Sequence, residues 1–202
     1  MKGLLLKDIY TLLKQFKFFL LILVVFSFVP QMSVYSFAIC YSAMLPVTAL
    51  AYDERSKWDK LAAMFPYSTE DIVVSKYVLG YICVAGSSVL TLLGQTIFAL
   101  IKNEAVQPDL LVEMLFLACA GVILQAINLP LMLKLGVEKG RMILISTIVI
   151  IAIGAAAISS QLTAFLDSIH LSVLLSTVIL VAVTAILSLL SIMLSERLHR
   201  RR

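Results

Sequence analysis

The sequence predicts an all-α, polytopic membrane protein, and three observations support this fold class. Of the 202 residues, 61% are hydrophobic and only 14% are charged, whereas soluble domains contain roughly 45–50% apolar and about 25% charged residues. Long stretches of the chain carry no charge, and the lysines and arginines gather at the ends of these stretches. A water-soluble fold could not cover so much apolar surface. We therefore expect residues 1–202 to form a single transmembrane domain.

Four runs are long enough to cross a bilayer as single helices, which takes about 20 apolar residues. They contain no Asp, Glu, Lys or Arg and cover residues 77–101, 114–133, 142–166 and 171–195. We expect each of these runs to be one transmembrane helix.

The first charge-free run, residues 18–51, admits two interpretations. At about 1.5 Å per residue it is too long for one span and slightly short for two. Pro30 and Gln31 near its middle favour a tight hairpin. The first span would then begin near Leu12, with Lys14 and Lys17 reaching back to the headgroups. This interpretation predicts six spans, and a single crossing predicts five.

The basic residues favour six spans, because lysine and arginine concentrate on the cytoplasmic side. Six spans place both termini and the segments around 52–76 and 134–141 in the cytoplasm, with every lysine and arginine except Lys102 on that side. Five spans would separate the N-terminal lysines from segment 52–76. We therefore expect a multi-pass protein of the cell membrane. The spread of the charges fits contact with anionic lipid, and we expect no nucleic-acid binding.

Residues 1–17 are predicted to form an amphipathic helix on the cytoplasmic membrane surface. Its apolar face contains Leu5, Ile9, Leu12, Leu13 and Phe16, and Lys7 and Lys14 lie opposite. The helix is interpreted either as a functional elbow or as an anchor that only sets topology.

Segment 52–76 is the largest cytoplasmic segment and contains a second amphipathic pattern. Trp58, Leu61, Ala62 and Phe65 follow the spacing of one helical face, and Pro66 closes this helix. Ser68 and Asp71 form a capping box that opens the next span. A helix of about ten residues is marginal in water. Its apolar face must therefore rest on the membrane interface or in a groove of a partner protein.

Catalytic and cofactor motifs are absent from the sequence. There is no H-E-x-x-H, no G-x-S-x-G and no phosphate loop, so an ATP-driven mechanism would need ATP to bind another polypeptide. The cysteines, Cys40, Cys83 and Cys119, lie in predicted spans and indicate neither a disulfide framework nor a metal site. We expect no enzyme activity, no metal and no cofactor on this chain.

The polar residues inside the predicted spans are few. Glu113 is the one candidate for an ion-coupling carboxylate, and its place near the outer surface favours an interfacial role. Gln95, Gln125 and Asn128 are candidates for a substrate path, although such groups commonly hydrogen-bond between helices.

Two cytoplasmic segments resemble a known family, the small six-span permeases of class-2 ATP-binding-cassette exporters. The first is Y-D-E-R-S-K-W-D-K at 52–60, which continues to F-P-Y-S at 65–68 and to Lys76. The second is N-L-P-L at 128–131, followed by Lys134 and G-V-E-K-G-R at 136–141. Length, span count and orientation are also similar. Related permeases include exporters of amphipathic or antimicrobial peptides, such as the phenol-soluble modulin exporters of Gram-positive bacteria.

The resemblance implies a half-transporter in which two permease chains, identical or paralogous, each dock a separate ATPase subunit that binds ATP and Mg²⁺. Residues 54–65 would be the coupling helix, and residues 1–17 the elbow. The implied contacts with the ATPase are Glu54, Trp58, Leu61, Phe65 and Pro66.

The expected function is therefore export of amphipathic or antimicrobial peptides, or of other amphiphiles. Many family members have large outer helices between the fifth and sixth spans, whereas only residues 161–170 or so are available here. This departure suits a compact exporter that takes its substrate laterally from the membrane. The alternatives are a passive peptide- or lipid-binding protein of the immunity type and an intramembrane enzyme.

Overall fold

The computed structural model describes residues 2–15, 17–29, 32–62, 64–65, 68–102, 110–140, 142, 146 and 173–199. The elements of this part of the chain are all helices, which confirms the all-α prediction for the described residues. They are α1 (Lys2–Gln15), α2 (Lys17–Phe28), α3 (Met32–Ser42), α4 (Leu45–Arg55), α5 (Trp58–Ala62), α6 (Thr69–Lys102), α7 (Leu110–Leu135) and α9 (Val173–His199).

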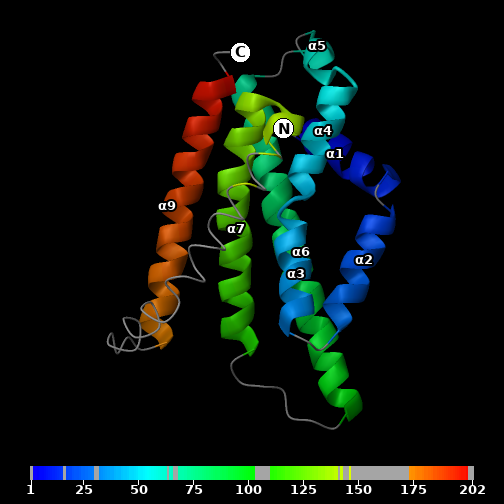
Figure 1. The fold of residues 1–202 in the computed structure, drawn as a ribbon, viewed down its shortest axis with the longest axis vertical. Coiled ribbons are helices and arrows are strands. Elements are labelled where there is room, and N and C mark those ends of the chain that lie inside the picture. Colours follow the sequence, from blue (N-terminus) through cyan, green and yellow to red (C-terminus); the bar gives the residue numbers. More distant parts are fainter. Residues whose placement is uncertain are drawn as a thin grey trace.

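The helices form an elongated bundle around α6 (Figure 1). Helix α6 packs against α1, α2, α3, α4, α7 and α9, so it is the central helix of the described bundle. The start of α1 and the end of α9 lie towards the same end of the bundle as α5 (Figure 1). The described parts of these three helices therefore share one end of the bundle.

Four segments of the described chain are long and apolar enough to cross a membrane. They are Tyr35–Arg55, formed by α3 and α4, then Glu70–Lys102, Leu110–Leu135 and Leu175–Leu198. These match the second, third, fourth and sixth predicted spans. Helix α2 corresponds to the first, but its 12 residues are fewer than the roughly 20 that a crossing needs. The fifth predicted span, 142–166, lies outside the described residues except at positions 142 and 146.

The second span is broken between α3 and α4 because a proline follows the break. Pro46 lies in the first turn of α4 and has no N–H to donate to the carbonyl of Ser42. The Ser42 hydroxyl bonds the Ile39 carbonyl at 2.7 Å and lies 2.8 Å from the Ser87 hydroxyl of α6. A polar contact between spans therefore lies beside the break.

A proline inside α7 creates the main polar contact with α9. Pro130 cannot donate to the carbonyl of Ala126, four residues earlier, which leaves that acceptor free. The Ser191 hydroxyl of α9 donates to this carbonyl at 2.5 Å. The Ser191 oxygen also lies 2.5 Å from the Tyr77 hydroxyl of α6. Helices α6, α7 and α9 are thus joined at one level by a backbone acceptor that the proline has released.

Helix α6 begins as the predicted capping box indicates. The Ser68 hydroxyl accepts a hydrogen bond of 3.0 Å from the backbone N–H of Asp71, which satisfies one of the free donors at the start of the helix. Glu70 and Asp71 in the first turn also favour the positive end of the helix dipole. The predicted start of the third span is confirmed.

Replacing Ser68 with alanine should lower the free energy of unfolding by about 1 kcal/mol, because the Asp71 N–H loses its acceptor. Unfolding of the purified chain by SDS titration in mixed micelles would measure this change. Thr96→Ala is the matched control, since the Thr96 hydroxyl donates to the Leu93 carbonyl of its own helix and caps no helix end. Equal effects of the two substitutions would contradict the capping role.

Helix α1 packs into the bundle with part of its predicted apolar face. Leu12 is buried in the core formed with Leu45 and Leu79, and Leu5 and Ile9 pack beside it. Leu13, which was predicted on the same face, is 50% exposed. Leu6 and Tyr10 are exposed on the same side of the helix as Leu13. The side of α1 that faces the bundle also carries a buried charge, Asp8.

Candidate functional site

Four charged side chains from three helices meet at the end of the bundle that carries α5. Lys7 and Asp8 belong to α1, Asp53 to α4 and Lys76 to α6. The nitrogen–oxygen distances are 3.1 Å for Lys7–Asp8, 2.8 Å for Asp8–Lys76, 2.5 Å for Lys76–Asp53 and 2.5 Å for Asp53–Lys7. Each lysine therefore contacts both aspartates, and positive and negative groups alternate around a closed cycle. We call these four residues the four-charge cluster.

Burial makes the four-charge cluster unusual. Asp8 is 1% exposed, Lys76 2% and Asp53 8%. A single charge at such a position would carry a large desolvation cost. The four formal charges of the cluster sum to zero, and each carboxylate has an oxygen within 3.1 Å of each ammonium nitrogen. The cluster therefore ties α1, α4 and α6 together, and the loss of a single member would leave a buried charge uncompensated.

Lys7 connects the four-charge cluster to α5. Its side chain is 25% exposed, more than those of the other three members. The Lys7 ammonium lies 4.3 Å from the centre of the Trp58 ring, within cation–π range. The indole N–H of Trp58 is buried and has no hydrogen-bond partner in the part of the chain that the structure describes. The first residue of α5 thus rests on the cluster.

The helix expected over residues 54–65 is divided into two parts. Helix α4 continues to Arg55, and α5 covers only Trp58–Ala62. Between them, Lys57 adopts a φ of 55°, a left-handed conformation that commonly terminates helices. The N–H of Lys57 bonds the Glu54 carbonyl at 3.2 Å. This turn redirects the chain, so α5 leaves the direction of α4.

An apolar patch lies on and just after α5, formed by Leu61, Met64 and Phe65. Their exposed fractions are 49%, 81% and 52%. Ala62 on the same helix is buried. Figure 1 places α5 at the tip of the bundle, beyond α4. Exposed apolar side chains grouped at a tip are typical of a contact surface for another molecule.

Glu54 joins segments 52–76 and 134–141, which the sequence predicted to be cytoplasmic. Its carboxylate accepts a hydrogen bond of 2.8 Å from the backbone N–H of Val137. Gly136, with a φ of 81°, ends α7 just before this contact. Asp53 and Glu54 are neighbours in sequence, so the last turn of α4 contacts α1 and α6 through one carboxylate and the residues after α7 through the other.

The five predicted ATPase contacts therefore separate. Leu61 and Phe65 lie in the apolar patch, Trp58 is half-buried beside Lys7, and Glu54 is bonded to Val137. Pro66 lies outside the described residues. Of the four described positions, Glu54, Leu61 and Phe65 are exposed and Trp58 is half-buried, and their contact with an ATPase stays a prediction.

The three predicted substrate-path residues do not form one site. Gln125 is fully buried and donates to the Tyr77 carbonyl of α6 at 2.9 Å, and Asn128 is 1% exposed on the same helix. Gln95 donates to the Val29 carbonyl at 3.1 Å. Along α6, Gln95 lies about 27 Å beyond Tyr77, at about 1.5 Å per residue. The side-chain oxygens of Gln125 and Asn128 are buried without a hydrogen-bond partner among the described residues.

Gly80 makes room for the Gln125 amide. A Cβ atom at Gly80 would lie 2.3 Å from the side-chain amide nitrogen of Gln125 and 2.4 Å from the carbon of that amide. The side chain of Gln125 on α7 therefore fills the space that a side chain at position 80 of α6 would occupy.

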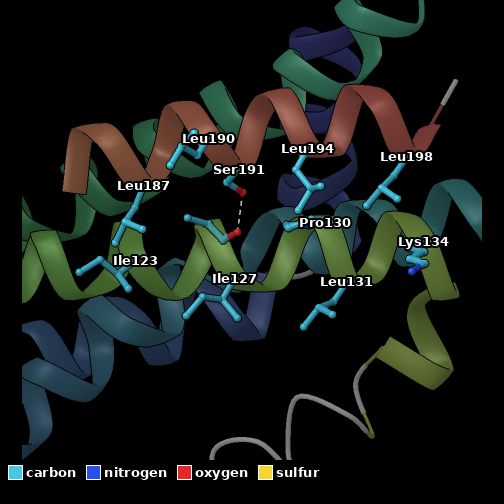
Figure 2. Close-up of a pocket in the computed structure, with 11 residues that line it drawn as sticks. Ile123, Ile127, Pro130, Leu131, Lys134, Leu187, Leu190, Ser191, Leu194 and Leu198 are labelled. Carbon is cyan, nitrogen blue, oxygen red and sulfur yellow. Dashed lines mark hydrogen bonds between the residues drawn. The ribbon is translucent and has the colours of Figure 1, made fainter. Parts of the chain in front are cut away.

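An apolar groove runs between α7 and α9, with a volume of about 550 Å³. Figure 2 shows leucine and isoleucine side chains from both helices along it, Ser191 near its middle and Lys134 towards one end. The lining residues are Ile123, Ala126, Ile127, Pro130, Leu131, Lys134, Leu187, Leu190, Ser191, Leu194 and Leu198. Such a groove can accommodate an apolar chain, with a cation available near one end.

Sequence reasoning did not identify the four-charge cluster, although one signal pointed to it. Asp8 lies four residues after Leu4 and four before Leu12, so it occupies the apolar stripe of α1. A charge on an apolar face near the membrane needs a partner of opposite charge. Lys76, directly before the second charge-free run, residues 77–101, was the available cation.

No curated protein and no solved structure gave a match to the chain. The family model described as ABC-2 family transporter protein matches residues 3–199, which is almost the whole chain. Together with the apolar helices, this match shows that the protein is a membrane permease of the ABC-2 transporter family.

Proposed function

We propose that the chain is the membrane subunit of an ATP-driven exporter and that a separate ATPase subunit docks on the apolar patch of Leu61, Met64 and Phe65. The carrying observation is the exposure of these three side chains at the tip of the bundle. Membership of the ABC-2 family supports the proposal, because permeases of this kind typically work with an ATP-binding-cassette ATPase. ATP and Mg²⁺ then belong to the partner.

The proposed topology has six spans and both termini in the cytoplasm. The meeting of α1, the end of α4 and the start of α6 in one cluster supports placing them on the same side of the cell membrane. Helix α1 is then the elbow, and its exposed Leu6, Tyr10 and Leu13 contact lipid. A second permease chain, identical or paralogous, completes the transporter.

The proposed substrates are amphiphiles, including amphipathic or antimicrobial peptides. The groove between α7 and α9 supports this substrate class, since its lining is apolar and Lys134 lies near one end. A substrate with an apolar side and an anionic group would fit both features. Roles for Gln95, Gln125 and Asn128 in the path remain predictions.

Leu61→Asp should abolish recovery of an ATPase with the tagged chain, because it places a carboxylate in the apolar patch. The measurement is a mild-detergent pull-down from the native membrane, followed by identification of the partner and an ATPase assay. Leu61→Met keeps the patch apolar and is the matched control. The parent chain recovered alone, even after crosslinking, would reject docking and favour a passive peptide- or lipid-binding protein.

A further inference from the structure

We propose that the four-charge cluster transmits movement of α5 to α6, so that a change at the apolar patch reaches the far end of the bundle. This inference rests on the proposed function, because it requires an ATPase docked on the patch. Lys7, Asp8, Asp53 and Lys76 are positioning residues in this scheme.

The contacts form a continuous chain from the patch to the central helix. Trp58 begins α5, and its ring lies against the ammonium of Lys7. Lys7 pairs with Asp53, and Asp53 pairs with Lys76 of α6. Asp8 pairs with both lysines and closes the cycle through α1. Movement of Trp58 therefore acts on Lys7. Lys7 belongs to α1 and pairs with Asp53 of α4, and each of its two aspartate partners also pairs with Lys76 of α6.

The cluster should move as a unit because its members are costly to separate. Withdrawal of one lysine or aspartate would leave an uncompensated charge at a position that is 1–8% exposed for three of the four members. A displaced Lys7 therefore draws its partners with it. The four-charge cluster should therefore shift from one fully paired arrangement to another, rather than separate in part.

Helix α6 carries the displacement across the membrane. It is one uninterrupted helix from Thr69 to Lys102, and Leu100 lies about 36 Å beyond Lys76, at about 1.5 Å per residue. Lys76 is near one end of the helix, and Leu100, which is 74% exposed, is near the other. A shift of Lys76 should therefore be detectable at Leu100.

The test uses two reporter cysteines, Met64→Cys in the patch and Leu100→Cys at the far end of α6. They are placed separately in a chain whose Cys40, Cys83 and Cys119 are replaced by alanine. The complex of the full chain with its co-purified ATPase is reconstituted in nanodiscs. Labelling by a polar maleimide is then timed with and without ATP and vanadate. In the parent chain, we expect the cysteine at residue 64 to react more slowly with the maleimide when the ATPase is docked. We expect nucleotide trapping to change the labelling rate of the cysteine at residue 100 by roughly fivefold or more.

The decisive variant is the double substitution Lys7→Met with Asp8→Asn. It removes one charge of each sign from α1 and leaves Asp53 and Lys76 as a balanced pair. We expect residue 64 to remain protected and the nucleotide response at residue 100 to fall below roughly twofold. Lys7→Arg keeps the charge and the cation–π contact and should preserve the response. Lys14→Met changes an exposed lysine of the same helix outside the cluster and should also preserve it.

Three results would overturn the inference. The response at residue 100 could persist in the double variant, or it could be missing from the parent chain. Protection of residue 64 could also disappear in the double variant, which would mean that the cluster only seats α5. Lack of protection at residue 64 in the parent chain would instead reject ATPase docking, and the inference would fall with the proposed function.

Discussion

Replacing Lys76 with methionine should lower the free energy of unfolding by about 3–5 kcal/mol, the cost of breaking a buried ion pair by removing one partner. Asp8 and Asp53 would keep Lys7 as their one remaining partner in the four-charge cluster. Asp8 is 1% exposed and Asp53 8%, so water can replace little of the lost interaction with the ammonium. SDS-induced unfolding and the yield of folded protein in mild detergent would measure the loss.

The origin of this loss can be tested by removing a second charge. Lys76→Met combined with Asp8→Asn leaves Lys7 and Asp53 as a balanced pair, so the double variant should be more stable than Lys76→Met alone. Lys134→Met is the control, because Lys134 is exposed and no ion pair is recorded for it among the described residues. The charges would not interact if the double variant lost as much free energy of unfolding as Lys76→Met and Asp8→Asn lose when their separate losses are added.

Gly80→Ala should lower the free energy of unfolding by about 2–4 kcal/mol, from overpacking together with a lost hydrogen bond. The added methyl group overlaps the Gln125 amide, which donates to the Tyr77 carbonyl. Gln125 is fully buried and cannot swing into solvent. Thermal denaturation in detergent would report the change.

The same helix contains a matched control for this substitution. A Cβ atom at Gly86 meets nothing within 4 Å, so Gly86→Ala should be neutral or stabilise the chain by about 0.5–1 kcal/mol. Gln125→Ala should suppress the effect of Gly80→Ala, because it removes the amide that the methyl group displaces. Equal effects at the two glycines would exclude the steric explanation.

The sequence predicted the membrane helices well because their signal is compositional. Uncharged runs of sufficient length at 77–101, 114–133 and 171–195 correspond to α6, α7 and α9, and Ser68 fixed the start of α6. The short α2 was harder to predict, since apolar composition alone does not say where a helix ends. The division of α4 from α5 depends on the backbone conformation of Lys57, for which no glycine or asparagine gave warning.

The candidate site was predicted only in part because it depends on pairs that are distant in sequence. Helical spacing correctly grouped Leu61 and Phe65, which are local neighbours. Helical spacing also placed Trp58 with them, and the family resemblance added Glu54. Tertiary contacts turn Glu54 to Val137 and Trp58 to Lys7. Basic residues near the spans were interpreted only as topology signals. That interpretation does not identify which lysines become buried, and Lys76 is a lysine that does.

The buried pairing of Asp8 with Lys76 also constrains biosynthesis. The two residues are 68 positions apart, so α1 leaves the ribosome well before its partner does. At roughly 5–20 residues per second, the nascent chain passes several seconds with Asp8 lacking its buried counter-ion. During this interval α1 cannot settle into its final place. Translational pausing before residue 76, or truncation there, should therefore expose the first helices to membrane proteases.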